Sequence, residues 1–212
     1  MERTPGFFKL HPLNLDLGDM LVQIFAVALG VILGFAVTAW NERVHQRALL
    51  HETVANIAAE LKSNQSGMHV VMKEHAKAAD VLAKLLARGR PSMTVSLAEG
   101  TEALRETGYL RVNVPLAIAW QIAQSDQGLT LLPYQDRYDL AWVYQLQTTY
   151  YQREERYENS LFGLVQSQNG NYFFQVLDMA NQLRAIVATE KQLDATYTTA
   201  LKRAKSEFKV NL

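Results

Sequence analysis

The sequence predicts an all-α protein in which one N-terminal transmembrane helix continues into a long amphipathic helix, packed with a C-terminal helical hairpin. An uncharged run of about 20 residues lies near the N-terminus of the 212-residue chain. Beyond it, apolar residues recur every three or four positions over long stretches, and no stretch alternates long enough to predict a strand. The prolines fall between these stretches, which supports continuous helices: Pro5, Pro12, Pro91, Pro115 and Pro133.

The transmembrane helix is predicted at residues 20–41. Within this run only Gln23 and Thr38 interrupt the apolar residues before Trp40. At 1.5 Å per residue the run spans the roughly 30 Å of a bilayer hydrocarbon core, and a Trp at its end is typical of the membrane interface.

A cleaved signal peptide is the alternative interpretation of this run. Residues 37–39 would suit a signal peptidase, and residues 1–19 form a tail ahead of the run. However, the tail has only Arg3 and Lys9 as basic residues, and the apolar run is longer than usual for a signal peptide. We therefore expect a retained anchor.

The anchor also carries small residues at every fourth position, namely Ala26, Gly30, Gly34 and Thr38. This spacing places them on one helix face, where two backbones can approach closely in lipid. The alternative is that Gly and Ala are simply frequent in membrane helices. We expect these four residues to pack against a second membrane helix.

An anchor-proximal long helix is predicted over residues 42–90. Its apolar positions continue without a breaker after the membrane run, and the Gly89–Pro91 segment ends the helix. Gly67 is a weak point, so a bend at residues 64–67 is the alternative to one continuous helix. The apolar stripe starts at Val44, Leu50, Val54, Ile57 and Leu61.

Residues 91–212 are predicted to form a helical extramembrane domain. Ser96 and Glu99 have the spacing of a capping box, which predicts a short helix closed by Gly108. Two long helices then form the hairpin. The remaining expected elements are a short helix at 115–123, turns at 125–128 and 168–171, and long helices from Pro133 and from 172 to 208.

Composition argues against several functional classes. Lysine and arginine total 21, as do aspartate and glutamate, so nucleic acid is not an expected partner. The chain has no cysteine, nucleophile elbow or glycine-rich phosphate loop. Asp136 and Asp139 share a helix face but have no basic or nucleophilic partner nearby in sequence. We expect no catalytic residue, no cofactor and no enzyme activity.

His69 and His75, with Glu74 and Asp80 nearby, are the residues that raise the question of a metal site. Ligands on one helix need a spacing of three or four residues, whereas six residues place these two side chains on different faces. The sequence therefore predicts no metal site.

A segment from Tyr150 to Glu158 is dense in tyrosine, arginine and glutamate. Tyrosine and arginine are enriched at interface hot spots, so the interface candidates are Tyr150, Arg153 and Tyr157, together with Trp40. The alternative is a solvated helix face held by pairs four residues apart, such as Arg153 with Tyr157 and Glu154 with Glu158 flanked by Arg156.

Three short segments carry a resemblance to a known family: Gly30–Gly34, Trp40-Asn41-Glu42-Arg43 and Glu60-Leu61-Lys62-Ser63. Over about 45 residues the chain resembles an uncharacterised family of bacterial single-span membrane proteins, a domain of unknown function whose apolar N-terminal helix ends in Trp-Asn-Glu. The resemblance implies a bacterial inner-membrane location, single-pass, with a periplasmic C-terminal domain. It implies no activity for any residue.

The expected function is therefore that of a non-enzymatic membrane-anchored scaffold or accessory subunit of a larger inner-membrane complex. Its partners would be the lipid bilayer and other membrane-protein subunits, itself, or both. The alternative is a stand-alone homo-oligomeric membrane sensor or signalling stalk, in which the long helix transmits a change across the membrane.

Overall fold

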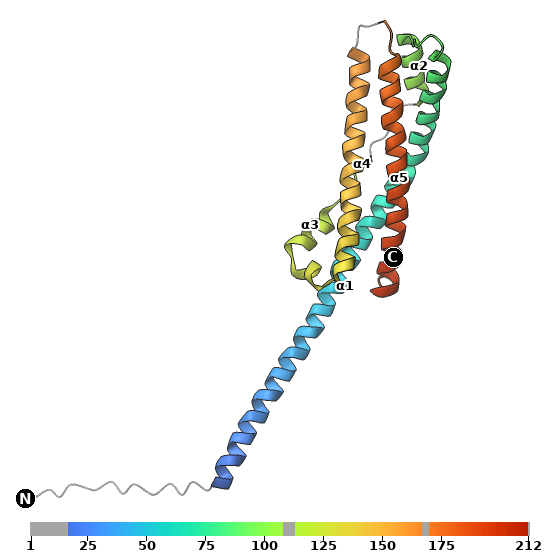
Figure 1. Ribbon diagram of the computed structural model, residues 1–212. Helices are drawn as coiled ribbons and strands as arrows, with labels where there is room; N and C mark the ends of the chain where they lie inside the picture. Colours follow the sequence, from blue (N-terminus) through green and yellow to red (C-terminus); the bar gives the residue numbers. More distant parts are fainter. Residues whose placement is uncertain (1–16, 108–112, 167–169, 212) are drawn as a thin grey trace, which may run out of the picture. The chain divides into compact units, whose positions relative to one another are not determined.

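The computed structural model describes residues 17–107, 113–166 and 170–211 (Figure 1). All regular structure in these ranges is helical, which confirms the predicted all-α class. Expectations for the tail before residue 17, for Gly108 and for residues 168–169 of the second turn lie outside the described residues. The chain divides into two compact units between Arg47 and Ala48, and each is described by itself.

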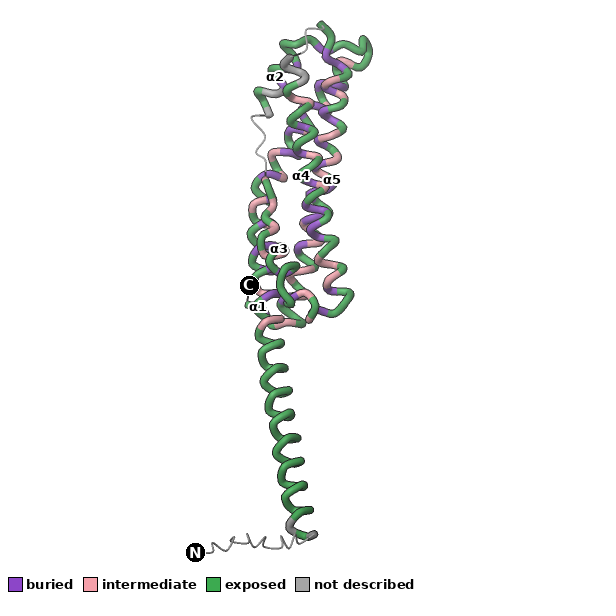
Figure 2. Tube along the Cα trace, turned by 90° about the vertical axis from the view of Figure 1, so that its left-hand side faces the viewer, coloured by how far each residue is buried: buried purple, intermediate pink, exposed green. Residues whose placement is uncertain are grey.

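The first unit contains the start of helix α1, which runs from Leu17 to Gly89. The side chains of residues 20–48 are all exposed, as the uniform green of this stretch in Figure 2 shows. They include Phe25, Phe35 and Trp40, each at least 70% exposed. Within the described ranges, α1 is the helix that is long and apolar enough to cross a membrane.

The second unit combines the remainder of α1 with all the later elements. α4 and α5 run side by side as the expected hairpin and pack against α1 (Figure 1). Because α1 residues 54–86 supply part of this unit's core, the boundary expected at residue 90 falls inside a compact unit. The later elements are α2 Leu97–Thr107, α3 Ile118–Ser125, the 3₁₀ helix η1 Gln127–Leu131, α4 Tyr134–Gln166 and α5 Phe173–Glu207.

The core of the second unit is built from side chains three, four or seven residues apart on the three long helices. These positions form the purple stripes of Figure 2. Helical spacing brings them onto one face of each helix, and their burial supplies the main favourable free energy of folding. Fully buried members include Ile57, Leu61, Met68, Leu82 and Leu85 of α1, Tyr150 of α4, and Met179, Leu183, Ile186, Leu193 and Tyr197 of α5.

α1 is continuous through Gly67, so the helix is not broken at residues 64–67. The glycine instead permits a close approach by the segment that precedes α3: a Cβ on Gly67 would lie 2.7 Å from Asn113 Oδ1. One turn earlier, Asn64 Nδ2 donates to Leu116 O, and Leu116 N–H donates to Asn64 Oδ1, each at 2.8 Å.

The same segment explains why α3 begins at Ile118, later than the expected start at Pro115. Asn64 holds Leu116 in place through main-chain hydrogen bonds, and the N–H of Ala119 donates to Glu60 Oε2 at 2.7 Å. A carboxylate at this position satisfies a main-chain N–H in the first turn of the helix, and its negative charge interacts favourably with the positive end of the helix dipole. After α3, the expected turn leads into η1.

The capping box predicted for α2 is present. Ser96 N–H and Oγ donate to Glu99 Oε2 at 2.9 and 2.7 Å, and Glu99 N–H donates to Ser96 Oγ at 3.3 Å. These bonds lower the pKa of Glu99, with the main-chain bond from Ser96 as the largest cause. Local sequence therefore fixes where α2 starts.

Asn171 joins the turn after α1 to the start of α5. Its Oδ1 accepts from Val95 N–H at 3.2 Å, and its Nδ2 donates to Met93 O at 2.9 Å. The N–H of Tyr172 also donates to Val95 O at 2.9 Å. Two turns that lie far apart in sequence are thus held together at one end of the helical unit.

Candidate functional site

The four small residues of the anchor lie on an open face of α1. Ala26, Gly30, Gly34 and Thr38 are all exposed, and a Cβ built on either glycine would meet no atom within 4 Å. Thr38 Oγ1 donates to Gly34 O at 3.0 Å, so its hydroxyl is satisfied within the helix. The face therefore offers close packing to a second helix without an unpaired hydroxyl.

The structure places the four interface candidates in different environments. Trp40 is 70% exposed, but Tyr150 and Tyr157 are 0% and 4% exposed, so neither offers a surface and the interface prediction is wrong for both. Burial raises the pKa of Tyr157 to about 12. Arg153 is half-buried, and its Nη1 donates to Ala185 O at 2.9 Å, which ties α4 to α5. The alternative of a solvated face is also wrong for Glu154, which points inward.

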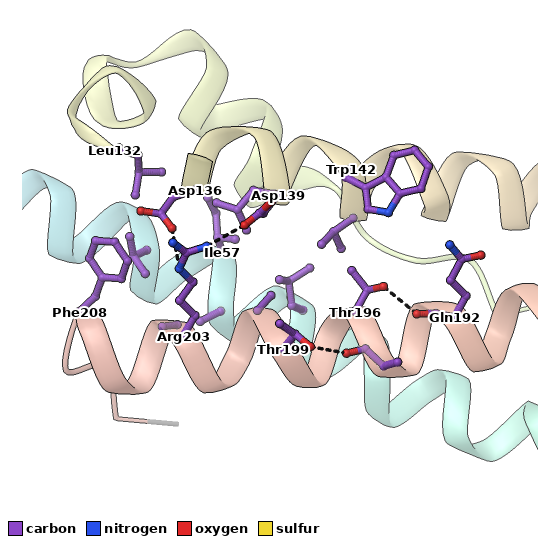
Figure 3. Close-up of a pocket in the computed structure, with 18 residues that line it drawn as sticks. Ile57, Leu132, Asp136, Asp139, Trp142, Gln192, Thr196, Thr199, Arg203 and Phe208 are labelled. Carbon is purple, nitrogen blue, oxygen red and sulfur yellow. Dashed lines mark hydrogen bonds and ion pairs between the residues drawn. The ribbon is translucent and has the colours of Figure 1, made fainter. Parts of the chain in front are cut away.

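A largely apolar groove of about 400 Å³ lies among α1, α4 and α5 in the second unit (Figure 3). Thr196 and Thr199 line it, and their hydroxyls donate to carbonyls of α5 at 2.7 and 2.9 Å. Their hydroxyl protons are therefore already used in hydrogen bonds within α5. The volume falls within the range of small-molecule sites. Apolar lining residues include Val54, Ile57, Leu140, Trp142 and Phe208.

One end of this groove carries an ion-pair cluster. Arg203 Nε lies 2.8 Å from Asp136 Oδ1, and Arg203 Nη1 lies 2.7 Å from Asp139 Oδ2. Burial raises the pKa of Asp136, and the guanidinium of Arg203 opposes this rise. The shared face predicted for the two aspartates is confirmed, and their partner is a structural arginine from α5.

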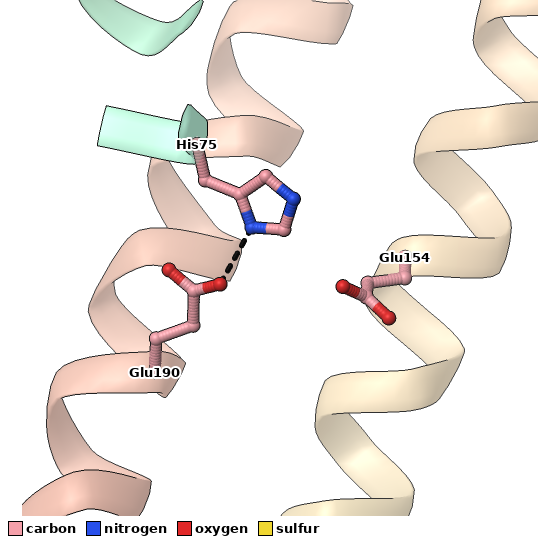
Figure 4. A group of neighbouring side chains, drawn as sticks. All are labelled: His75, Glu154 and Glu190. Carbon is pink, nitrogen blue, oxygen red and sulfur yellow. Dashed lines mark hydrogen bonds and ion pairs between the residues drawn. The ribbon is translucent and has the colours of Figure 1, made fainter. Parts of the chain in front are cut away.

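The second polar site is a buried polar cluster, formed by His75 of α1, Tyr150 and Glu154 of α4, and Glu190 of α5. His75, Glu154 and Glu190 are 2%, 3% and 0% exposed. His75 Nδ1 lies 2.5 Å from Glu190 Oε1 (Figure 4). The hydroxyl of Tyr150 donates a short hydrogen bond to Glu154 Oε1 and lies 3.4 Å from Glu190 Oε1.

Burial dominates the electrostatics of this cluster. It raises the pKa of Glu154 to about 7, and the charge of Glu190 adds to the rise. The hydrogen bond from Tyr150, the charge of His75 and the main-chain N–H of Asn113 oppose it. Burial also raises the pKa of Tyr150, so the phenol keeps its proton. Glu154 Oε2 and Glu190 Oε2 are buried without a hydrogen-bond partner, which is rare and calls for a physical explanation.

The two histidines singled out in the sequence have separate environments, as their spacing predicts. His69 Nε2 lies 2.7 Å from Asp194 Oδ1 near the surface, whereas His75 lies inside. The buried polar cluster was missed because its members come from three helices. A signal was present in the sequence: His75 and Glu190 occupy core-facing positions of apolar stripes, between Val71 and Ala78 in α1 and between Ile186 and Leu193 in α5.

Comparisons of this chain with protein-family models, with curated proteins and with solved structures gave no match. The resemblance to bacterial single-span membrane proteins therefore stays a prediction.

Proposed function

We propose that this protein is a non-enzymatic membrane-anchored scaffold or accessory subunit of a larger complex in the bacterial inner membrane, with its helical unit in the periplasm. The observation that carries the proposal is the anchor itself. Residues 20–41 are uncharged and exposed, and the positions of Gly30 and Gly34 are open to a neighbouring backbone. Such a surface is stable only in an apolar solvent, and its small-residue face suits a second membrane helix.

The helical unit supports a contact role as well. Ile118 and Ile122 are 58% and 55% exposed on one face of α3, and Tyr138 and Trp142 are 58% and 47% exposed one turn apart on α4. Exposed apolar and aromatic side chains of this kind favour protein contacts. By contrast, the acidic groups lining the groove are held by Arg203, which argues against their use in acid–base chemistry.

Affinity capture tests this proposal. Tagged full-length protein is solubilised mildly from native membranes, and the captured material is identified by mass spectrometry. We expect unrelated membrane-protein subunits in stoichiometric amounts. Recovery of the protein only with itself would contradict the accessory-subunit proposal and would favour the homo-oligomeric sensor or stalk, to which the continuous α1 helix is also suited.

A pair of matched variants tests the anchor face in the same experiment. Gly30→Ile with Gly34→Ile fills the open face, and we expect the captured complex to be lost. Leu29→Ile with Leu33→Ile has the same spacing on another face of the helix and serves as the control, which should retain the complex. Equal recovery from both double variants would remove the small-residue face from the interface.

A further inference from the structure

His75, Glu154 and Glu190 each offer one ligand atom, and these atoms all lie within 4.8 Å of one another. In the described ranges they are the one group of three or more metal-ligating side chains gathered this closely. Figure 4 shows the imidazole and the two carboxylates directed toward a common centre, each from a different helix.

The four carboxylate oxygens of Glu154 and Glu190 fall into two groups: those that face the hydroxyl of Tyr150 and those that do not. This hydroxyl faces Oε1 of both Glu154 and Glu190, while Oε2 of both is buried without a hydrogen bond of ordinary geometry. The main-chain N–H of Asn113 also faces the Glu154 carboxylate, so Glu190 Oε2 is the oxygen that most lacks a partner. A buried carboxylate oxygen without a partner is costly in free energy. A hydrogen bond that orients a carboxylate from behind is also typical of the residues surrounding a metal ion.

Glu60 shows that this arrangement is not a general property of buried glutamates in the unit. It too faces a tyrosine of α4, and Tyr144 OH donates to its Oε1 at 2.7 Å. Its Oε2 accepts from Ala119 N–H at 2.7 Å, so both oxygens are satisfied. Among the buried glutamates of the described residues, the unpartnered oxygens therefore belong to the buried polar cluster.

We propose that His75, Glu154 and Glu190 bind one divalent first-row transition-metal ion, of the class Mn²⁺, Fe²⁺ or Zn²⁺. One imidazole nitrogen with two carboxylates suits these ions; the set contains no sulfur for a soft metal, and an imidazole is a poor ligand for Ca²⁺ or Mg²⁺. Two carboxylates also balance the charge of a divalent cation, which removes the cost of burying them.

The surroundings indicate a structural ion. The three side chains are at most 3% exposed, so the centre is closed, whereas catalytic metal sites keep a position open to substrate. Bonds of about 2.0–2.2 Å to nitrogen and oxygen require the ligand atoms, which lie within 4.8 Å of one another, to move inward when the ion binds. The ion would join α1, α4 and α5 midway along the unit, and this inference does not depend on the proposed accessory function.

Metal content and calorimetric titration test the site on the full-length protein in detergent. Protein purified without chelator is analysed for Mn, Fe and Zn by mass spectrometry, then stripped and titrated with Zn²⁺ and with Mn²⁺. We expect one equivalent of bound ion, and tighter binding of Zn²⁺ than of Mn²⁺. Because an ion bound only to the folded state stabilises it, removal should lower the thermal midpoint by about 5 °C or more.

Variants assign the binding to these residues. Glu154→Gln and Glu190→Gln should each lower the affinity for Zn²⁺ at least tenfold, while the metal-free variants unfold at or above the midpoint of the metal-free wild type because a buried charge is removed. Glu60→Gln is the matched control in the core, and His69→Asn is the control for adventitious binding at the surface. Both controls should keep the full stoichiometry.

Three results would overturn the proposal. The first is less than 0.1 equivalent of metal together with no heat of binding for Zn²⁺ or Mn²⁺. The second is a stoichiometry that falls with His69→Asn but not with Glu154→Gln or Glu190→Gln. The third is an unchanged thermal midpoint of the wild type after removal of a bound ion.

Discussion

Asn64 of α1 is hydrogen-bonded to both main-chain groups of Leu116, 52 residues later, with two distances of 2.8 Å. The side-chain amide thereby satisfies the main-chain N–H and C=O of Leu116, which lies before the start of α3 and outside any helix. Asn64 is buried, so water does not compete for these bonds. The position of α3 along α1 depends on this pair.

Asn64→Ala should therefore lower the free energy of unfolding by about 2 kcal/mol, because the main-chain N–H and C=O of Leu116 both lose their partner and each such bond contributes about 1 kcal/mol. Ser66→Ala is the control: Ser66 is exposed, its Oγ bonds only to Lys62 O, and its loss should cost less than about 0.5 kcal/mol. Denaturant unfolding followed by tryptophan fluorescence measures both. Equal effects would show that the Leu116 bonds contribute nothing.

Gly67 and Gly100 predict gains of different size for the same substitution. In Gly67→Ala the new Cβ would lie 2.7 Å from Asn113 Oδ1, so the Asn113 side chain must shift and the gain from a better helix former is reduced or cancelled. In Gly100→Ala the Cβ meets nothing within 4 Å inside α2, and the better helix former should raise stability by about 0.5–1 kcal/mol. Thermal midpoints compare the two, and a larger gain from Gly67→Ala would contradict the close approach at Gly67.

Arg203→Met should destabilise the protein in a pH-dependent way. Burial raises the folded pKa of Asp136; Glu207 and Asp139 add to the rise, and Arg203 opposes it. Without Arg203 the folded pKa rises further above the unfolded value, so stability is lost as pH rises through that window. We expect a loss of about 2 kcal/mol at pH 7.5 and a smaller loss at pH 5.

The double variant Asp136→Asn with Arg203→Met isolates this effect. It removes the titrating carboxyl, so the difference from wild type should vary little between the two pH values. Urea unfolding at pH 5 and at pH 7.5 compares each of the two variants, Arg203→Met and the double variant, with wild type. A loss from Arg203→Met alone that is equal at both pH values would show that Asp136 does not sense the arginine.

The proposed orientation can be tested with single cysteines, since the chain has none of its own. Ser92→Cys and Ser206→Cys occupy exposed positions of the helical unit. Both should react with an impermeant maleimide in intact cells if this unit is periplasmic, and both should react in lysed cells as a control. Protection of both in intact cells would reverse the orientation.

The long elements could be predicted from sequence because their signals are local. The continuous α1, the hairpin of α4 and α5 and the capping box at Ser96 follow from helical spacing and from one pair of residues three apart. The start of α3 was misplaced because Asn64 and Glu60, far away in sequence, decide it.

The polar sites were harder to predict because one residue type suits two environments. Tyrosine can form an interface or fill a core if its hydroxyl finds a partner, and Tyr150 does the latter with Glu154. No spacing rule within one helix connects Glu154 with His75 and Glu190. Their association depends on the register of three packed helices.

The α5 residues that contact α1 are synthesised late, because they lie near the C-terminal end of the chain. Gln65 bonds to Asp194 across 129 positions, and His75 bonds to Glu190 across 115. At 5–20 residues per second, the apolar face of α1 emerges roughly ten seconds before the helix that covers it. Closing this unit thus requires contacts of high sequence separation, and a chain that stops before Phe173 lacks the helix that covers the α5 side of that face.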